Sequence, residues 1–223
     1  MPFVLRGYYA ILDLPGEAPE DPTVLVVRAE ARLAARPACL QLRAKRMRAV
    51  DLRRTAALLL PACHAAGVPL CVNDRLDVAL AAGADGVHLG QNDLPLADAL
   101  RIRPNRQFFV GISTHDLAQA QVAARQGADY IGFGPVFATQ TKADADPAVG
   151  LDRLREVCAA VALPVVAIGG ITLATIDAVA ATGAAAAAVI AAIDQAADPV
   201  AVAKGVAQAF AIGYTRTAST NLR

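Results

Sequence analysis

Short apolar runs alternate with longer amphipathic segments along the whole chain. Most of the runs are continuously apolar, which is typical of strands buried on both faces of a parallel sheet. The segments between them, such as 75–83 and 116–127, have helical periodicity and close on a glycine suited to a left-handed cap. Eight strands are predicted, at residues 7–13, 38–43, 69–73, 86–90, 108–113, 129–134, 164–170 and 185–190.

A weak internal repeat favours one architecture. The tripeptide Gly-Ala-Asp occurs at 83–85 and 127–129, each time after a predicted helix and before a predicted strand, and Gly-Ala-Ala at 183–185 falls in the equivalent place. Such repetition indicates a β/α unit used several times. We predict the α/β class, with a single (β/α)8 TIM barrel over residues 1–213 and a flexible polar tail at 214–223. A doubly wound open sheet is the structural alternative.

Composition narrows the choice of partners. Of the 223 residues 56% are hydrophobic and 18% charged, which is enough for one well-filled core. The net charge of +1 gives no footprint for nucleic acid or an anionic membrane, and the chain has few aromatic residues and no tryptophan on which bases could stack. Small-molecule substrates are the expected partners. The oligomeric state is left open, with a homodimer as one option.

The chain is expected to be cytoplasmic. Its first residues do not form a basic segment followed by a long apolar run, as a signal peptide would. The longest uncharged stretch, between Asp177 and Asp194, is shorter than the roughly 20 residues of a membrane span. The four cysteines show no CxxC spacing and are interpreted as reduced core thiols.

Polar residues gather where the predicted strands end. In a TIM barrel the loops after the strands meet at one mouth, where the chemistry takes place. These residues are Gln41, Arg43, Lys45, Asn73, Asp74, Gln91, Asn92, Asp93, Ser113, Thr114, His115, Thr139, Thr141, Lys142, Gly169 and Gly170.

Three cations of this set, Arg43, Lys45 and Lys142, indicate an anionic ligand. The same mouth holds hydroxyl donors and accessible backbone N–H groups, at Ser113, Thr139, Thr141, Gly169 and Gly170. Such a set of donors suits a phosphate or a diphosphate.

Two carboxylates, Asp74 and Asp93, would repel that anion unless a cation lay between them. Mg²⁺ typically binds one or two carboxylates together with substrate phosphate oxygens and water. A single aspartate after a strand is more often a helix cap, but two on adjacent strands opposite three cations favour a metal bridge. The sequence therefore predicts an Mg²⁺–diphosphate site.

Other chemistries have less support. His88 lies within an apolar run and is interpreted as a satisfied core residue, and His115 begins a helix. There is no Cys/His pair and no GxSxG elbow, so acyl-enzyme chemistry is not indicated.

The motifs QLRAK, VND, HLGQND, GIS, GPVFATQTK and AIGGIT, in this order and spacing, resemble thiamine-phosphate synthases. The resemblance covers nearly the whole chain, from YYAILD to Ile193. It implies a (β/α)8 barrel that joins 4-amino-2-methyl-5-(diphosphooxymethyl)pyrimidine to thiazole phosphate and releases pyrophosphate and thiamine phosphate. It also implies Mg²⁺ as the cofactor, carried by Asp74 and Asp93.

The resemblance assigns the other site residues to the two substrates. The pyrimidine diphosphate would be bound by Gln41, Arg43, Lys45, Asn73 and Lys142, with Ser113 near its leaving group. The thiazole phosphate would be held by Thr139, Gln140, Thr141, Gly170, Ile190 and Ala191. Arg43, Lys45, Ser113 and Lys142 would be the catalytic residues.

The chain departs from the family at strand eight. The usual Gly-Ala-Asp-Gly-Val-Ser-like strand is here Gly-Ala-Ala-Ala-Ala-Ala, and the following Ile-Ser is Ile190-Ala191. This places a hydroxyl contact to the thiazole phosphate in question but leaves the diphosphate site intact. The alternatives are a thiazole tautomerase-like paralogue, a non-catalytic phosphate-ligand barrel and a generic phosphosugar enzyme.

Overall fold

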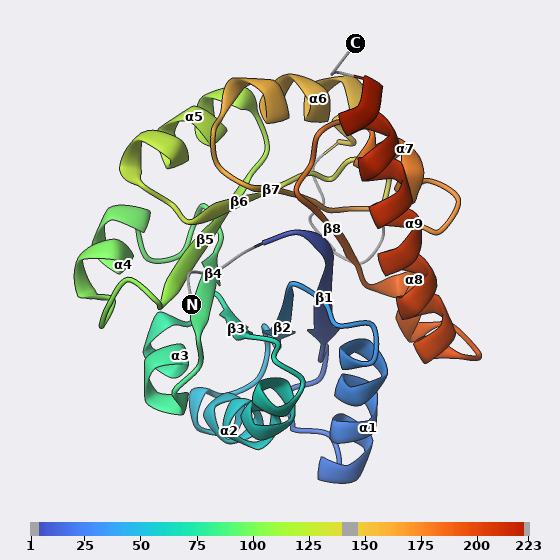
Figure 1. Ribbon diagram of the computed structural model, residues 1–223. Helices are drawn as coiled ribbons and strands as arrows, with labels where there is room; N and C mark the ends of the chain where they lie inside the picture. The colour runs from blue at the N-terminus through green and yellow to red at the C-terminus, as the bar shows by residue number, and fades with distance from the viewer. Residues whose placement is uncertain (1–4, 140–146, 221–223) are drawn as a thin grey trace.

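Eight parallel strands close into a barrel, and each strand pairs with its neighbours in sequence. The computed structural model describes residues 5–139 and 147–220, the last five of these by their backbone alone. Figure 1 shows the strands at the centre and the helices as an outer ring. The predicted (β/α)8 barrel is confirmed. The strands are β1 (Gly7–Asp13), β2 (Cys39–Arg43), β3 (Leu70–Asn73), β4 (Gly86–Leu89), β5 (Phe109–Thr114), β6 (Tyr130–Phe133), β7 (Val165–Ala167) and β8 (Ala186–Val189).

At least one helix follows each strand, as a right-handed β/α barrel requires. In the described part of the chain these are α1 (Pro22–Leu33), α2 (Ala49–Ala65), α3 (Leu76–Ala82), α4 (Leu96–Ile102), α5 (Leu117–Gln126), α6 (Gly150–Ala160), α7 (Ile176–Ala180), α8 (Ala191–Asp194) and α9 (Pro199–Thr220). None of them combines the length and apolar character needed to cross a bilayer.

Residues of each strand alternate between the barrel interior and the helix layer. The interior cluster includes Tyr9 of β1 and Tyr130 of β6, whereas β8 contributes only Ala186 and Ala188. Tyr9 is the register partner of Ala188, so a small residue lies beside a large one. The alanine-rich sequence of β8 is therefore explained by the space that the tyrosines fill.

The four cysteines carry free thiols, as predicted. Cys39 and Cys71 are fully buried in the barrel interior. Burial raises the pKa of Cys63 to about 12 and that of Cys158 to about 11, which keeps both thiols protonated and unreactive.

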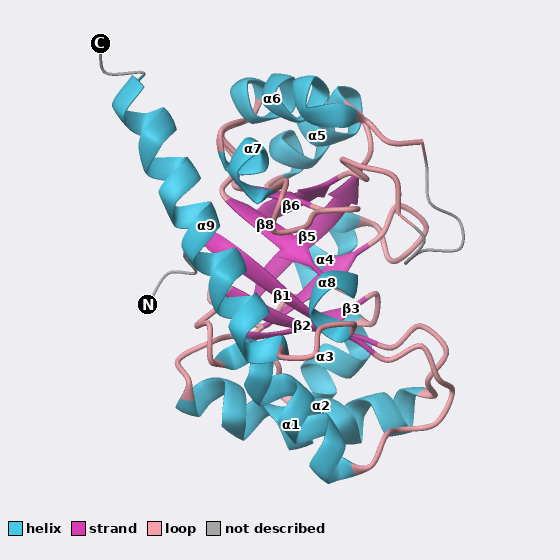
Figure 2. Cartoon of the chain, turned by 90° about the vertical axis from the view of Figure 1, so that its right-hand side faces the viewer, coloured by secondary structure: helices cyan, strands magenta, loops and turns pink. Residues whose placement is uncertain are grey.

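The tail predicted from residue 214 does not begin there. Helix α9 continues to Thr220. Tyr214 stacks on Phe210 with ring centroids 6.3 Å apart, and its hydroxyl accepts a 2.8 Å hydrogen bond from Arg6. These contacts keep residue 214 in the helix, and Figure 2 shows how far the helix extends along the side of the barrel. Flexibility beyond Tyr214 stays a prediction, and residues 221–223 lie outside the described part.

Candidate active site

Two side-chain amides, one in the middle of β2 and one at the end of β3, lie in contact. Gln41 and Asn73 are both buried, and Gln41 Nε2 donates to Asn73 Oδ1 over 2.6 Å. Tyr9 in turn donates its hydroxyl to Gln41 Oε1 over 2.8 Å. These bonds fix which atom of the Gln41 amide is the donor and which the acceptor. A substrate at this position would meet amides of defined orientation.

The same hydrogen-bonded chain continues across the barrel to Ser113. The hydroxyls of Tyr9 and Tyr130 lie 2.7 Å apart, and Tyr130 also contacts His88 Nδ1 at 2.9 Å. His88 Nε2 then lies 3.0 Å from Ser113 Oγ. Three predicted site residues, Gln41, Asn73 and Ser113, thus belong to one buried network whose connecting groups are aromatic.

His88 is a satisfied core residue, as the sequence predicts. It is buried and hydrogen-bonded on both ring nitrogens, as a core histidine would be, yet one of its partners is a predicted site residue. It is also the register partner of Asn73. An inward-facing polar residue beside a predicted ligand was the signal that could have found it.

The predicted metal carboxylates lie in contact. Asp74 follows β3 in the left-handed region (φ 64°), which aspartate tolerates better than most residues. Asp93 accepts a 2.6 Å hydrogen bond from the Gly90 N–H in the turn after β4. Burial, followed by a hydrogen bond and charge repulsion from Asp93, raises the pKa of Asp74 to about 6. Nearby Lys45 and Arg43 oppose the shift.

The predicted cations are divided between different carboxylates. Lys45 Nζ lies 3.7 Å from Asp74 Oδ2, and the lysine side chain is about half exposed. Arg43 instead donates to Asp13 Oδ1 over 2.6 Å, so its partner is the last residue of β1. Asp13 was not singled out from the sequence, although it too is a polar residue at a strand end. Lys142 lies outside the described residues.

The loops after β6 and β7 pack against each other. Phe137 N–H donates to Gly169 O over 3.0 Å. Gly169 and Gly170 both have positive φ, and a Cβ on Gly170 would lie only 2.5 Å from Ala138 O. Glycine is required at position 170 because the two loops approach each other so closely. Ala138, the residue before Thr139, therefore lies against Gly170, whereas Gln140 and Thr141 lie outside the described residues.

The chain turns directly after β8 into the single-turn helix α8. Ile190 stands at its N-cap with no side-chain capping bond, and Ala191 is its first residue. The first N–H groups of any helix lack partners within the helix, so main-chain donors are present here although the hydroxyl of the usual serine is not.

In the described part of the chain there is no group of three or more His, Cys, Asp or Glu side chains that could hold a metal ion. Asp74 and Asp93 are a pair and could supply two carboxylate ligands to a cation bound there. The remaining ligands would come from substrate or water.

Comparisons with known proteins agree on one family. The family model described as thiamine monophosphate synthase matches residues 15–193. The thiamine-phosphate synthase of Methanoculleus marisnigri is 49% identical over 178 residues, covering 79% of this chain and 84% of that protein. That of Roseiflexus castenholzii is 44% identical over 203 residues, covering 90% and 87%.

Solved structures show the same likeness. The thiamine phosphate pyrophosphorylase from Pyrococcus furiosus superposes with a TM-score of 0.81 at 31% identity, covering 92% of this chain and 96% of that one. A 3-hexulose-6-phosphate synthase at 20% identity, with a TM-score of 0.69, shares the fold.

Proposed function

The chain belongs to the thiamine monophosphate synthase family, and from this premise we propose that it joins the pyrimidine diphosphate named above to thiazole phosphate. The products are thiamine phosphate and pyrophosphate. The chain is thus a transferase of thiamine biosynthesis that acts on small molecules.

The observation that carries the proposal is the pair of touching carboxylates at the ends of two neighbouring strands. Asp74 and Asp93 lie close together, and burial, followed by a hydrogen bond and charge repulsion from Asp93, raises the pKa of Asp74 to about 6. A divalent cation removes that repulsion. The pair therefore supports a site in which a metal joins the protein to an anionic substrate.

Mg²⁺ fits this pair. Both ligands are hard oxygen donors, and Mg²⁺ usually keeps several positions for substrate phosphates and water. We assign the ion to Asp74 and Asp93. When bound, it would neutralise charge on the diphosphate oxygens and so favour the departure of pyrophosphate.

The bond that breaks joins the pyrimidine methylene carbon to a diphosphate oxygen, and its electron pair leaves with pyrophosphate. The bond that forms joins the same carbon to the thiazole nitrogen. Because negative charge grows on the leaving group, prearranged cations lower the barrier, and Arg43, Lys45 and Lys142 are assigned this role. Ser113, fixed by His88, would donate to the same group. No side-chain nucleophile is needed.

The two amides suit the pyrimidine end of that substrate. Gln41 and Asn73 offer both donors and acceptors for the ring nitrogens and the amino group. The thiazole phosphate is assigned to the mouth formed by Thr139, Gln140, Thr141, Gly170, Ile190 and Ala191. Holding the nitrogen in line with the methylene carbon then completes the catalytic requirement.

Purified protein with both substrates and Mg²⁺ tests the proposal. We expect equal amounts of thiamine phosphate and pyrophosphate. Arg43→Ala should lower the rate at saturating substrate on the order of a hundredfold, because a contact to developing charge is lost. Arg46→Ala is the matched control, since Arg46 is exposed and pairs with Glu17.

Absence of pyrophosphate release would overturn the proposal. Binding of thiazole phosphate without product would favour the tautomerase-like paralogue or the non-catalytic barrel. A cytoplasmic location and a homodimer stay predictions.

A further inference from the structure

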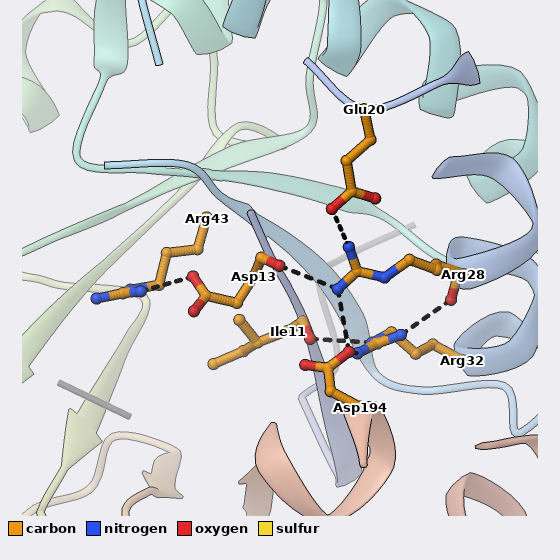
Figure 3. A network of polar contacts seen from close by, with 7 residues as sticks. All are labelled: Ile11, Asp13, Glu20, Arg28, Arg32, Arg43 and Asp194. Carbon is orange, nitrogen blue, oxygen red and sulfur yellow. Dashed lines mark hydrogen bonds and ion pairs between the residues drawn. The ribbon is translucent and has the colours of Figure 1, made fainter. Parts of the chain in front are cut away.

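Three charged side chains connect helix α1 to the short helix α8. Asp194, the last residue of α8, accepts with Oδ1 from Arg28 Nη2 at 3.1 Å and from Arg32 Nη2. Both arginines belong to α1. Figure 3 shows the two guanidinium groups converging on this one carboxylate.

The side chain of Arg32 is almost completely buried. Its side chain is 2% exposed, and its other N–H groups donate to Ile11 O and Arg28 O, each over 3.0 Å. A buried guanidinium is unfavourable unless a carboxylate pairs with it. Asp194 supplies that carboxylate, so α8 is fixed in place relative to the barrel wall.

Helix α8 needs such an anchor. It has four residues, and a helix of one turn has almost no stability of its own. The backbone N–H of Asp194 donates to Ile190 O over 3.1 Å, so the residue that is held by α1 closes the turn that begins at Ile190. Displacement of Asp194 would therefore move Ile190 and Ala191.

The position of the main-chain N–H groups in the Ile190–Ala191 turn matters more here than it would with a serine at position 191. Ala191 has no hydroxyl, so the phosphate assigned to this turn depends on main-chain N–H groups alone. A main-chain donor cannot rotate to follow its acceptor as a hydroxyl can, so its position decides whether the bond forms.

The contacts of Arg28 also extend to the site assigned to the diphosphate. Arg28 Nη2 donates to Asp13 O over 3.1 Å, and Asp13 Oδ1 accepts from Arg43 Nη1 over 2.6 Å. Arg28 thus contacts both the residue that anchors α8 and the residue that orients Arg43.

We propose that Asp194 is a positioning residue for the thiazole phosphate, with Arg28 and Arg32 holding it so that the Ile190–Ala191 turn presents its main-chain donors. This inference rests on the proposed function. Asp194 itself does not touch substrate. Its role is to replace, by rigidity of the turn, what the missing hydroxyl would contribute.

Steady-state kinetics of Asp194→Asn test the proposal. The KM for thiazole phosphate should rise on the order of tenfold, equivalent to about one hydrogen bond to a charged group. The saturated rate and the KM for the pyrimidine diphosphate should stay within about twofold of wild type. Glu20→Gln is the matched control, because Glu20 also pairs with Arg28 but lies far from α8 in sequence, and it should leave all three values unchanged.

A double variant separates positioning from folding stability. Asp194→Asn leaves Arg32 buried without its carboxylate and should lower the melting temperature. Arg32→Met with Asp194→Leu removes both charges and should recover the melting temperature, because a buried pair can often be replaced by apolar residues. It should keep the raised KM.

An unchanged KM in Asp194→Asn, or recovery of both stability and KM in the double variant, would overturn the inference while the proposed function stands. A wild-type protein that makes no thiamine phosphate would overturn both.

Discussion

Asp74 combines a charge and a backbone conformation, and the two can be separated by one substitution. Asparagine tolerates the left-handed region as aspartate does, so Asp74→Asn removes the charge but keeps φ near 64°. If the pair holds Mg²⁺, Asp74→Asn and Asp93→Asn should each lower the saturated rate on the order of a hundredfold, measured by pyrophosphate release.

The folded state of these two variants should be unharmed. Removing one of the two carboxylates removes a partly buried charge and the repulsion between them, so the free energy of unfolding in urea should not fall. Asp77→Asn, an exposed carboxylate on α3 paired with Arg75, is the control. Full activity of either site variant in the presence of a chelator would exclude the metal role.

Tyr130 is the branch point of the buried network. Its hydroxyl contacts both Tyr9 and His88, and burial raises its pKa well above the ordinary value. Tyr130→Phe removes a hydrogen-bond partner from two buried groups. We expect a loss of about 1–3 kcal/mol in the free energy of unfolding, measured in urea.

The same variant should weaken substrate binding. Gln41 and Ser113 would lose part of the chain that fixes them, so the KM for the pyrimidine diphosphate should rise several-fold. Tyr214→Phe, which removes a surface hydroxyl bonded to Arg6, is the matched control. Unchanged stability and KM would show that the hydroxyl has no organising role.

At the scale of single residues, candidates could be selected where the residue type carried the signal, and their roles stay predictions. Asp74 and Asp93 could be found because carboxylates at two adjacent strand ends are conspicuous beside an anion site. Asp13 ends β1 in the same way, but a lone aspartate there resembles a turn residue, and its ion pair with Arg43 depends on strand register. His88 is a satisfied core residue as predicted, but an apolar run does not reveal that its ring contacts Ser113.

At the scale of elements, the Gly-Ala-Asp repeat has a structural explanation. Asp85 and Asp129 each precede a strand, and each accepts with its carboxylate from the backbone N–H of its register partner on the previous strand. These bonds are Leu70 N–H to Asp85 Oδ2 at 2.8 Å and Val110 N–H to Asp129 Oδ2 at 2.7 Å. The aspartate of each repeat therefore connects the start of its own strand to the preceding strand by a hydrogen bond. Ala185, in the third copy, has no carboxylate, and its backbone donates to Val165 O and accepts from Gly7 N–H.

The two aspartates should differ in their contribution to stability. Asp129 also pairs with Arg103, whose side chain is 7% exposed, whereas the partner of Asp85 is His64, which is 52% exposed. Asp129→Ala should lower the free energy of unfolding by about 2–3 kcal/mol, because it leaves a buried N–H and a buried cation without this partner. Asp85→Ala should lower it by about 1 kcal/mol. Urea unfolding of both variants measures the difference, and equal losses would contradict the explanation.

Elements were predictable to the extent that burial was complete on both faces. All eight predicted strands are found, because parallel strands in a barrel must be apolar throughout. The start of the polar tail was placed at residue 214, within α9, since YTRTAST is polar and gives no apolar stripe. The helix is extended past residue 213 by contacts of Tyr214 with Phe210, one turn earlier in the same helix, and with Arg6, which is distant in the sequence.

At the scale of the whole molecule, the barrel brings together groups that are far apart in the chain. Asp13 and Arg43 are in contact at the mouth although 30 positions separate them in the sequence. Arg32 and Asp194 are in contact although 162 positions separate them. The first contact follows from the register of β1 with β2, and the second from barrel closure, which pairs β1 with β8. The sequence could predict that strand ends converge. It could not predict which pairs touch, because pairing depends on register and side-chain direction.

Barrel closure also means that a ligand bridging several strand ends should stabilise the entire fold. Pyrophosphate with Mg²⁺ would contact the ends of β2, β3 and β4 together, and a ligand at a hundred times its Kd adds about 2.7 kcal/mol to the free energy of unfolding. For a chain of this size that corresponds to a rise in melting temperature of about 5–10 °C. Thermal unfolding should show this rise only when both are present, since each carboxylate repels pyrophosphate without the metal. Asp74→Asn and Asp93→Asn should abolish it, whereas Asp77→Asn should retain it, all at matched ionic strength. An equal rise from pyrophosphate in excess chelator would mean that the cationic side chains alone bind the anion and that the carboxylate pair has another role.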